Sequence, residues 1–399
     1  MQVKTQVEDL QNYLTDASNM PGGHAERLFV PETVDEVADV LREANEAGAS
    51  VTISGARTGT VGGAVPFGGY VISLERLNKI KTIDKAAMKA VVEPGVVLAD
   101  LQKAVEAEGL YYPPDPTEWS CQIGGTVATN ASGARSFKYG ATREFVSALT
   151  VVLADGDVLK LGRGEVFSNA DGRVELTTES GKKISAKVPT YKRPNVRKNV
   201  SGYFNETPLD AIDLFIGSEG TLGVIAEIEL RLVPKPEGFF SGVVFFEKHG
   251  DLLGFVDEVK AASRGNALTD VRASANGGNA LTDVRASASV RASASLVEYF
   301  DDRALSFIRE KFPETPEAMA GAVYFEQETT AETEDGLFEA WSEMLERHGA
   351  DIDRSWFTTT DADREKMRAF RHALPVAVNE HVVRNKQRKI GTDMAVPDE

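Results

Sequence analysis

Three separate glycine-rich segments constrain what this chain can fold into and bind. They are Ser-Gly-Ala-Arg-Thr-Gly-Thr-Val-Gly-Gly at 54–63, Gly-Gly-Thr-Val-Ala-Thr-Asn-Ala-Ser-Gly at 124–133, and Gly-Ser-Glu-Gly-Thr-Leu-Gly-Val-Ile at 217–225. Glycine permits unusual backbone angles and carries no side chain that would block close contact. Exposed backbone N–H groups in such loops favour anionic oxygens, phosphate above all. The segments therefore predict a long, flat, anionic ligand, for which a large dinucleotide is the natural candidate.

Composition and charge narrow the classes of partner. The chain has 399 residues, 42% of them hydrophobic, which is enough for about two or three domains. Its 44 Lys and Arg against 61 Asp and Glu give a net charge of −17, which argues against nucleic acid or an anionic membrane surface. The single cysteine, Cys121, excludes an intrachain disulfide and fits a reducing compartment. Because there is neither an apolar signal core nor an apolar run near the roughly 20 residues of a membrane span, we expect a cytoplasmic protein.

The first half of the chain mixes short strands, helices and a hairpin. Apolar spacing predicts helices over 31–48 and 98–108, each ended by a glycine. Short β-type runs predict strands at 51–53, 71–74, 90–93 and 226–232, and Asp-Gly-Asp at 155–157 predicts a hairpin between 149–154 and 158–161. The polar stretch 163–200 reads as loop. This mixture favours an α+β fold over a repeated βαβ sheet.

The second half alternates strands and helices from about residue 238 onward, which predicts a compact α/β sandwich. Inside it, the ten residues 266–275 recur without change at 279–288, and Val-Arg-Ala-Ser-Ala-Ser recurs at 284–289 and 290–295. The unit is too short for a solenoid repeat. Its small polar composition predicts a disordered surface insertion at about 264–295 without chemistry, the alternative being a docking segment for a partner.

The first glycine-rich segment matches neither of two common phosphate-binding motifs. It lacks the Gly-Lys-Ser/Thr of a Walker loop, and it does not open a long helix as Gly-x-Gly-x-x-Gly does. Alone it could be a plain loop between strands. Together with its neighbours it resembles the phosphate-binding loop of the FAD fold shared by vanillyl-alcohol oxidase and p-cresol methylhydroxylase (PCMH). Segments 110–116, 121–133, 138–140 and 215–225 follow the order of that family, within which the D-lactate dehydrogenase and glycolate oxidase flavoproteins are most similar.

The resemblance implies a division of the chain and a cofactor. It implies an N-terminal helical segment at 1–26, a two-subdomain PCMH-type FAD-binding domain at 27–235, and a ferredoxin-like α/β sandwich at 236–399 that caps the substrate. Relatives that bond FAD covalently often use a histidine in the first loop. No histidine occurs between residues 25 and 248, so we expect FAD to be bound non-covalently.

The resemblance also assigns cofactor-binding residues within the three segments and their surroundings. Those expected to wrap the pyrophosphate are Ser54, Gly55, Ala56, Arg57, Thr58, Gly59, Gly62 and Gly63. Those expected to line the flavin and ribityl chain are Pro114, Asp115, Cys121, Ile123, Gly124, Gly125, Asn130, Gly133 and Gly140. Those expected to close over the adenine side and the dimethylbenzene region are Glu219, Gly223 and Ile225.

Two of these residues call for separate interpretation. Arg57 stands where the family commonly has glycine, and it either pairs with a phosphate or points to solvent. Cys121 has no histidine near it in sequence. We therefore expect Cys121 to be a small buried residue beside the flavin rather than a nucleophile.

The substrate end is assigned from two segments, Phe-Arg-His-Ala-Leu-Pro at 370–375 and Gly-Thr-Asp-Met-Ala-Val-Pro at 391–397, which resemble the D-lactate dehydrogenase relatives. In those relatives an arginine matching Arg371 grips the substrate carboxylate, a task that suits a planar guanidinium. The alternative for Arg371 is a surface salt bridge. His372 is a second catalytic candidate and His381 a weaker one, while Lys386, Arg388 and Lys389 form a basic run that is usually solvated.

The predicted reaction is oxidation of a D-2-hydroxy acid, such as D-lactate or a glycolate-like acid, by hydride transfer to flavin N5. The family continues after Val396-Pro397 into His-x-Gly-Asp-Gly-Asn-x-His, which supplies the catalytic base and often metal ligands, whereas this sequence stops at Glu399. We therefore expect a C-terminally truncated chain with no metal site and with a base that is missing or donated by another polypeptide. The alternative is a non-catalytic FAD-binding subunit of an electron-transfer complex. The electron acceptor (quinone, cytochrome or electron-transfer protein) stays open, as does a homodimer.

Overall fold

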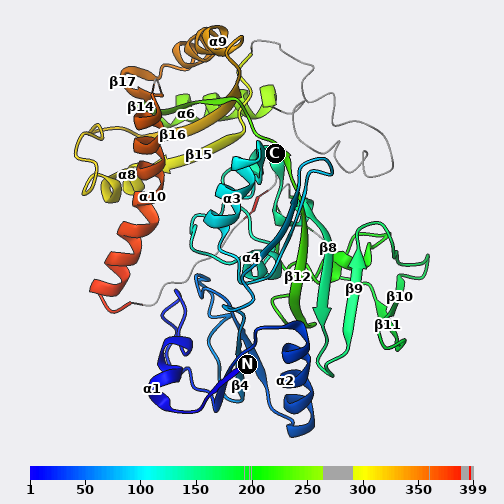
Figure 1. Ribbon diagram of the computed structural model, residues 1–399. Coiled ribbons are helices and arrows are strands. Elements are labelled where there is room, and N and C mark those ends of the chain that lie inside the picture. Colours follow the sequence, from blue (N-terminus) through cyan, green and yellow to red (C-terminus); the bar gives the residue numbers. More distant parts are fainter. Residues whose placement is uncertain are drawn as a thin grey trace.

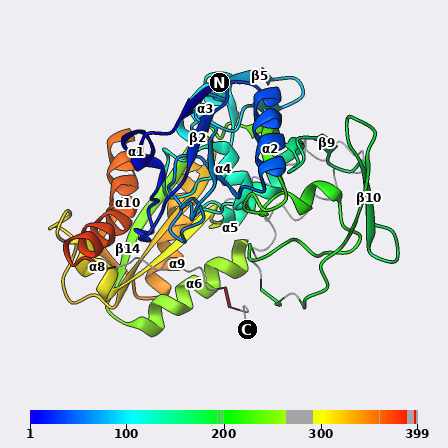
Figure 2. The same ribbon diagram turned by 90° about the horizontal axis from the view of Figure 1, so that it is seen from below.

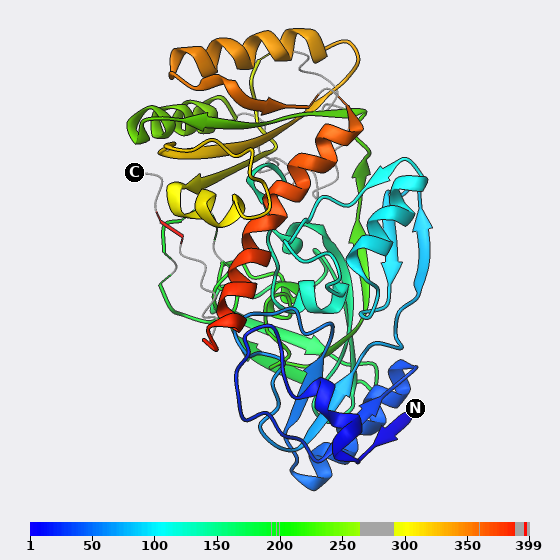
Figure 3. The ribbon, with the colours of Figure 1, turned by 90° about the vertical axis from the view of Figure 1, so that its left-hand side faces the viewer.

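The computed structural model describes residues 1–192, 194–196, 198, 200–263, 291–358, 360–387 and 395–396. Figure 1 shows two parts, one built from the first 237 residues and one that begins with strand β14. The long C-terminal helix α10 (Asp361–Arg384) leaves the second part and runs down along the first (Figure 3).

The first sheet contains β1 (Gln2–Lys4), β2 (Arg27–Val30), β4 (Tyr70–Ser73) and β3 (Val51–Ser54), in the order β1-β2-β4-β3. Strands β2 and β3 both pair with β4 in parallel. One face packs on helix α2 (Val34–Ala47), which begins where Thr33 accepts a hydrogen bond from the Glu36 N–H and ends at left-handed Gly48. The other face packs on α1 (Val7–Leu10) and the 3₁₀ turn η1 (Gln11–Tyr13). The segment predicted to be helical over 1–26 thus has only these two short helical turns and also contributes β1.

The second sheet is fully antiparallel and contains five strands in the order β5-β6-β12-β8-β9. Its strands are β5 (Ile80–Asp84), β6 (Lys89–Val92), β12 (Val224–Arg231), β8 (Val146–Val152) and β9 (Val158–Gly162). Alternate residues such as Leu149, Val151 and Ile228 point to the largest hydrophobic core, which also holds residues of α3 (Leu98–Ala107) and α4 (Ile123–Ala128).

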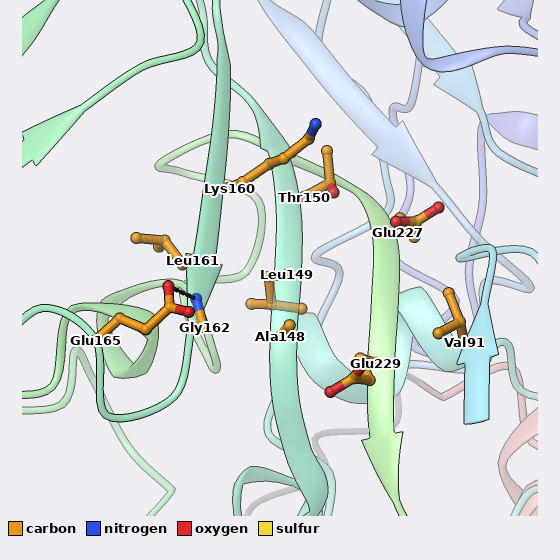
Figure 4. A pocket seen from close by; sticks show the side chains of 10 residues that line it. All are labelled: Val91, Ala148, Leu149, Thr150, Lys160, Leu161, Gly162, Glu165, Glu227 and Glu229. Carbon is orange, nitrogen blue, oxygen red and sulfur yellow. Dashed lines mark hydrogen bonds between the residues drawn. The ribbon is translucent and has the colours of Figure 1, made fainter. Parts of the chain in front are cut away.

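On the opposite face of this sheet, Val152, Val224 and Ala226 pack against α2. Further along this face lies a pocket of about 270 Å³, and Figure 4 shows the side chains that line it. Its two glutamates on β12 already have partners on neighbouring strands: Lys89 Nζ lies 2.7 Å from Glu229 Oε1, and Lys81 Nζ lies 2.5 Å from Glu227 Oε2. No residue of the three glycine-rich segments lines this pocket. It is a solvated sheet face with cross-strand ion pairs.

Shorter elements complete the first part. They are β7 (Leu110–Tyr111) paired with β13 (Val233–Pro234), α5 (Ser136–Tyr139), and the 3₁₀ turns η2 (Thr142–Phe145) and η3 (Ala211–Leu214). The loop predicted over 163–200 is wrong for part of its length, because β10 (Arg173–Thr177) and β11 (Lys183–Lys187) form an antiparallel hairpin there. Val174 and Leu176 of β10 are buried while their polar neighbours face solvent.

The second part is a four-stranded antiparallel sheet in the order β15-β16-β14-β17, with helices on both faces. Its strands are β15 (Leu296–Asp301), β16 (Gly321–Thr329), β14 (Gly238–Phe246) and β17 (Asp351–Phe357). Alternating residues of β14 divide between two cores. Phe240 and Val244 pack with α6 (His249–Ser263) and α9 (Glu334–Arg347), whereas Val243 and Phe245 pack with α8 (Asp302–Ile308) and α10.

The predicted disordered insertion needs one correction. Residues 264–290 lie outside the described residues, but 291–295 are ordered and packed. Ala292 and Ala294 are buried in the core between β14, α6 and α9, and the Ser295 N–H donates to the Glu326 carbonyl oxygen over 2.7 Å. The end of the repeat is therefore part of the sheet's edge.

No helix in the described part of the chain combines the length and the apolar character that crossing a membrane requires.

Candidate active site

The three glycine-rich segments converge in space although they are far apart in sequence. The first follows β3, the second opens α4, and the third leads into β12. The N–H groups of Gly217 and Glu219 donate to the carbonyl oxygens of Val127 and Ala128 over 3.0 and 2.8 Å, which ties the third segment to the second. A β-carbon at Gly63 would lie 3.7 Å from Glu219 Oε2, so the third segment also reaches the first.

The glycines serve two different purposes. Gly124 and Gly133 allow the backbone to pack closely, because a β-carbon there would lie 2.5 Å from Pro94 Cβ and 1.8 Å from the Asp115 carbonyl oxygen. At Gly59 and Gly125 the space beside the backbone is open, with nothing within 4 Å. Bare backbone bordering open space is the arrangement that admits a ligand close to N–H groups.

The other predicted cofactor residues fall into two groups. Ser54, Pro114, Asp115, Cys121, Ile123 and Asn130 are buried where the segments meet. Gly140, Gly223 and Ile225 are used for packing: Ile225 joins the main core, and β-carbons at Gly140 and Gly223 would meet Glu144 and Val151 at 2.7 Å. Burial raises the pKa of the Cys121 thiol to about 12, which makes it a poor nucleophile near neutral pH.

A pocket of about 420 Å³ opens beside the first segment. Its walls come from the N-terminal segment, the first glycine-rich segment, residues 117–118 and helix α10. The lining residues are Asn12, Thr15, Asp16, Ala17, Ala56, Arg57, Thr58, Thr60, Thr117, Glu118, Pro375 and Asn379. Its volume is in the range of small-molecule sites. In addition, Gln122 Oε1, 3.2 Å from a β-carbon at Gly55, is a buried acceptor without a partner among the described residues. An open cradle with an unused acceptor fits a polar cofactor.

Arg371 lies where α10 meets the segment after β7. Its Nε donates to Glu298 Oε2 over 2.8 Å, and its Nη1 lies 3.4 Å from Asp115 Oδ2. The side chain is 6% exposed, so the alternative of a surface salt bridge does not describe it. Burial acts to lower the pKa of Arg371, but Glu298 and Asp115 outweigh it and raise the pKa, which keeps the guanidinium charged.

Asp115 is shared with a second arginine, Arg135, whose Nη1 lies 3.2 Å away. Arg135 also binds Glu326 on β16 through two hydrogen bonds of 2.7 and 3.1 Å. Sequence reasoning missed Arg135 and Glu326. The motif Asn-Ala-Ser-Gly-Ala-Arg places Arg135 two residues after a glycine predicted to line the flavin, but nothing local indicates a partner 191 residues away.

His372 contacts a tryptophan that was also missed. The His372 and Trp119 ring centres are 4.2 Å apart at 73°, and Arg368 Cζ lies 4.1 Å from the centre of the same indole ring. His372 Nε2 and Trp119 Nε1 are buried without a hydrogen-bond partner among the described residues. Burial, with nearby Arg371, lowers the pKa of His372, so the ring is neutral at pH 7.

The weaker candidates lie near or beyond the C-terminal end of α10. His381 faces Phe307 at 5.4 Å and is exposed, Lys386 follows α10, and Arg388 and Lys389 lie outside the described residues. Within the described ranges, no group of three or more His, Cys, Asp or Glu side chains is placed to hold a metal ion.

Comparison with known proteins identifies the class of this domain. Residues 25–162 match the family described as "FAD binding domain". A solved structure of alkyldihydroxyacetonephosphate synthase superposes with a TM-score of 0.64 over 96% of this chain and 66% of that one, at 14% identity. The chain therefore carries an FAD-binding domain with the mixed α/β fold of the PCMH type, and FAD is its cofactor.

Three known proteins are more similar to this chain in sequence than that synthase is. D-lactate dehydrogenase of Anaerostipes hadrus is 40% identical over 234 residues, which are 58% of this chain and 42% of that protein. Glycolate oxidase subunit GlcD of Bacillus subtilis is 35% identical over 227 residues, 56% of this chain and 40% of that protein. A D-2-hydroxyglutarate dehydrogenase of Xanthomonas citri is 36% identical over 238 residues, 59% of this chain and 43% of that protein. The chain thus matches less than half the length of each relative.

Proposed function

We propose that the protein is an FAD-dependent oxidoreductase that oxidises a D-2-hydroxy acid of the D-lactate or glycolate type. The relatives named D-lactate dehydrogenase, glycolate oxidase subunit and D-2-hydroxyglutarate dehydrogenase support the substrate class. The observation that carries the proposal is the meeting of Arg371 and Asp115. Although 256 residues separate them, Arg371 Nη1 lies 3.4 Å from Asp115, so a carboxylate-binding cation stands next to a segment expected to line the flavin.

In this proposal the residues divide the work between binding and proton transfer. When bound, FAD supplies the acceptor for the hydride that leaves the substrate α-carbon. Arg371 binds the substrate carboxylate through a charge-assisted hydrogen bond, while Glu298 and Asp115 fix the plane of its guanidinium. His372, neutral at pH 7, can accept the hydroxyl proton at Nε2 when its other ring nitrogen carries the hydrogen. Among the described residues we therefore propose His372 as the base, with a group donated by another polypeptide as the alternative.

The proposal extends to cofactor attachment, domain organisation and location. The absence of histidine from 25–248 supports non-covalent FAD. We assign 27–235 to the two-subdomain FAD-binding domain and 236–399 to a ferredoxin-like cap, consistent with the sheet of β14–β17 and its two helical faces. A cytoplasmic location and a quinone, cytochrome or electron-transfer protein as acceptor complete the proposal.

Anaerobic reduction of the flavin tests the activity. The purified full chain should carry a flavin that acid precipitation releases, and D-lactate, glycolate or D-2-hydroxyglutarate should bleach its visible absorbance while L-lactate should not. Arg371→Met should weaken the apparent affinity for the acid by about tenfold or more, the loss expected from a hydrogen bond to a charged group. If the chain holds FAD and none of the acids bleaches it, the activity proposed here is wrong for this chain.

A second function is favoured by one observation. Arg371 is already paired with Glu298 and Asp115, so a substrate carboxylate must compete with two resident ones. A non-catalytic FAD-binding subunit of an electron-transfer complex would keep these pairs permanently. In that case the flavin is reduced only by a partner protein, and hydroxy acids leave its spectrum unchanged.

A further inference from the structure

Arg57 has an unusual position in the first glycine-rich segment. Its backbone is left-handed, with φ of 59°, which costs a residue with a β-carbon about 1–2 kcal/mol relative to a right-handed one. It is also the one basic residue within the three glycine-rich segments, whose other charged residue is Glu219. Backbone strain at such a place points to a role for the side chain, since glycine would fit without strain.

The side chain is fixed by the N-terminal segment rather than extended into solvent. Arg57 Cζ lies 4.8 Å from the centre of the Tyr13 ring, and Nη1 donates to Ser54 Oγ and to the Gly55 carbonyl oxygen, each over 3.1 Å. Tyr13 is held in turn by Glu75, whose carboxylate oxygens accept from its hydroxyl over 3.1 and 3.0 Å. The guanidinium is therefore oriented before any ligand binds.

Among the described residues that line the neighbouring pocket, Arg57 is the only cation. The pocket's two carboxylates have their own donors: Asp16 accepts from the N–H groups of Ser18 and Ala64 over 2.9 and 3.4 Å, and Glu118 accepts from Ser120. The Nε and Nη2 groups of Arg57 have no such hydrogen-bond partner in the described part of the chain. Elsewhere at the site, Arg135 and Arg371 are both bound to carboxylates.

We propose that Arg57, oriented by Tyr13, binds the pyrophosphate of FAD and supplies the positive charge that the other described lining residues of this pocket lack. The N-terminal segment then belongs to the cofactor site, because Tyr13 and the backbone of Ala17, which donates to the Arg57 carbonyl oxygen over 3.1 Å, hold the loop in place. The inference rests on FAD binding alone and is independent of which acid the protein oxidises.

Titration of the flavin-free full chain with FAD, followed by quenching of flavin fluorescence, tests this role. Arg57→Gly should weaken FAD binding by about 10- to 100-fold, the loss of one or two hydrogen bonds to a charged group. Its thermal unfolding should not worsen, because φ of 59° suits glycine. Arg57→Lys should give an intermediate loss, since lysine keeps the charge but not the planar stacking. Tyr13→Leu should cost about 2- to 5-fold through the missing cation–π contact.

Two controls separate phosphate binding from a general effect. Arg42→Gln changes an arginine whose side chain is 54% exposed on α2 and should leave FAD affinity unchanged. Riboflavin, which has no phosphate, should bind Arg57→Gly and the parent chain equally, and the salt dependence of FAD affinity should be shallower in Arg57→Gly. Unchanged FAD affinity in Arg57→Gly, or an equal loss for riboflavin, would overturn the assignment whatever the substrate tests show.

Discussion

Each glycine-rich segment contains one residue other than glycine with left-handed backbone: Arg57, Asn130 and Glu219, with φ of 59°, 46° and 52°. Asn130 is the one of the three that tolerates this conformation easily. Hydrogen bonds to neighbouring segments hold two of these left-handed residues in place. Asn130 Oδ1 accepts from the Arg143 N–H over 2.9 Å, and the Glu219 N–H donates to the Ala128 carbonyl oxygen over 2.8 Å. The loops are thus fixed by the protein itself, and binding of FAD needs little further ordering.

The two kinds of glycine at the site can be separated by substitution to alanine. Gly133→Ala should destabilise the flavin-free protein by about 1–3 kcal/mol, because the new β-carbon would stand 1.8 Å from the Asp115 carbonyl oxygen and the backbone must move. Gly125→Ala should leave stability equal or raise it by up to about 1 kcal/mol, because the position is helical and open. Denaturant unfolding of both variants measures this difference.

The same pair tests the shape of the cradle. Gly125→Ala should reduce FAD affinity despite its intact fold, because its methyl group enters the space proposed for the cofactor. A Gly125→Ala protein that binds FAD as well as the parent chain would place the cofactor away from the start of α4. A Gly133→Ala protein of undiminished stability would mean that the close approach to Asp115 is not needed.

Among the secondary-structure elements, η3 depends on a buried ion cluster. Arg143 Nη1 donates to Asp213 Oδ1 over 2.7 Å, and Arg163 Nη2 donates to the same oxygen over 3.1 Å. Arg143 Nη2 also donates to the Ile216 carbonyl oxygen, directly before the third glycine-rich segment. The cluster therefore joins η2, the residue after β9, and the approach to that segment.

Asp213→Asn should cost about 3–5 kcal/mol, because two partly or fully buried guanidinium groups lose their shared carboxylate. Asp155→Asn is the matched control. Its ion pair with Lys182 is exposed, so it should cost at most about 1 kcal/mol. Urea unfolding of the two variants gives the comparison, and equal costs would show that burial of the cluster does not matter.

The cluster also sets a pH dependence. Burial acts to raise the pKa of Asp213, but Arg163 and Arg143 outweigh it, and the pKa is lowered. A carboxyl with a lower pKa in the folded state stabilises fully above its ordinary range, and that stabilisation is lost as the pH falls below about 4. Asp213→Asn should flatten this part of the stability profile, whereas Asp155→Asn should leave most of it.

Elements with their own apolar periodicity could be predicted from sequence, and those whose burial depends on distant partners could not. Helix α2 and strands β3, β4 and β14 carry enough regular apolar residues within a few turns or repeats to indicate their type. The hairpin β10–β11 has only Val174 and Leu176 as buried apolar positions on its first strand, among polar neighbours. Its stability comes from packing on the main core, which a local pattern does not reveal.

For the molecule as a whole, the same distinction applies to the site. The glycine-rich segments could be predicted because a backbone that must approach a ligand leaves a local sequence signature. The contacts between the two parts have no such signature: Arg135 pairs with Glu326 across 191 residues, and Lys138 and Tyr139 both reach Glu328. Such pairs depend on how two independently patterned sheets meet, which only the tertiary structure decides.

The Arg135–Glu326 pair should control the coupling between the two parts. The side chains are 16% and 6% exposed, and Arg135 also lies over the rings of Tyr111 and Phe239 at 5.7 and 5.4 Å. Glu326→Gln should cost about 3–5 kcal/mol, because Arg135 keeps its burial and loses its bidentate partner. Arg135→Met combined with Glu326→Leu should recover much of that loss, because no unpaired charge remains and the apolar side chains can fill the interface.

Calorimetry of the single and double variants checks this. If the ion pair couples the parts, Glu326→Gln should broaden the unfolding transition or divide it in two, and the double variant should sharpen it again. The exposed pair Lys311–Glu380, with side chains 41% and 50% exposed, provides the control. Its removal should change the free energy of unfolding by at most about 1 kcal/mol and leave the width of the unfolding transition unchanged. If the double variant is no more stable than Glu326→Gln, the unpaired charge on Arg135 is not the cause of the loss, and the carboxylate of Glu326 acts through Asp115. In Glu326→Gln, Asp115 would be left with both Arg135 and Arg371, so loss of Glu326 would also reach the arginine proposed to bind the substrate carboxylate.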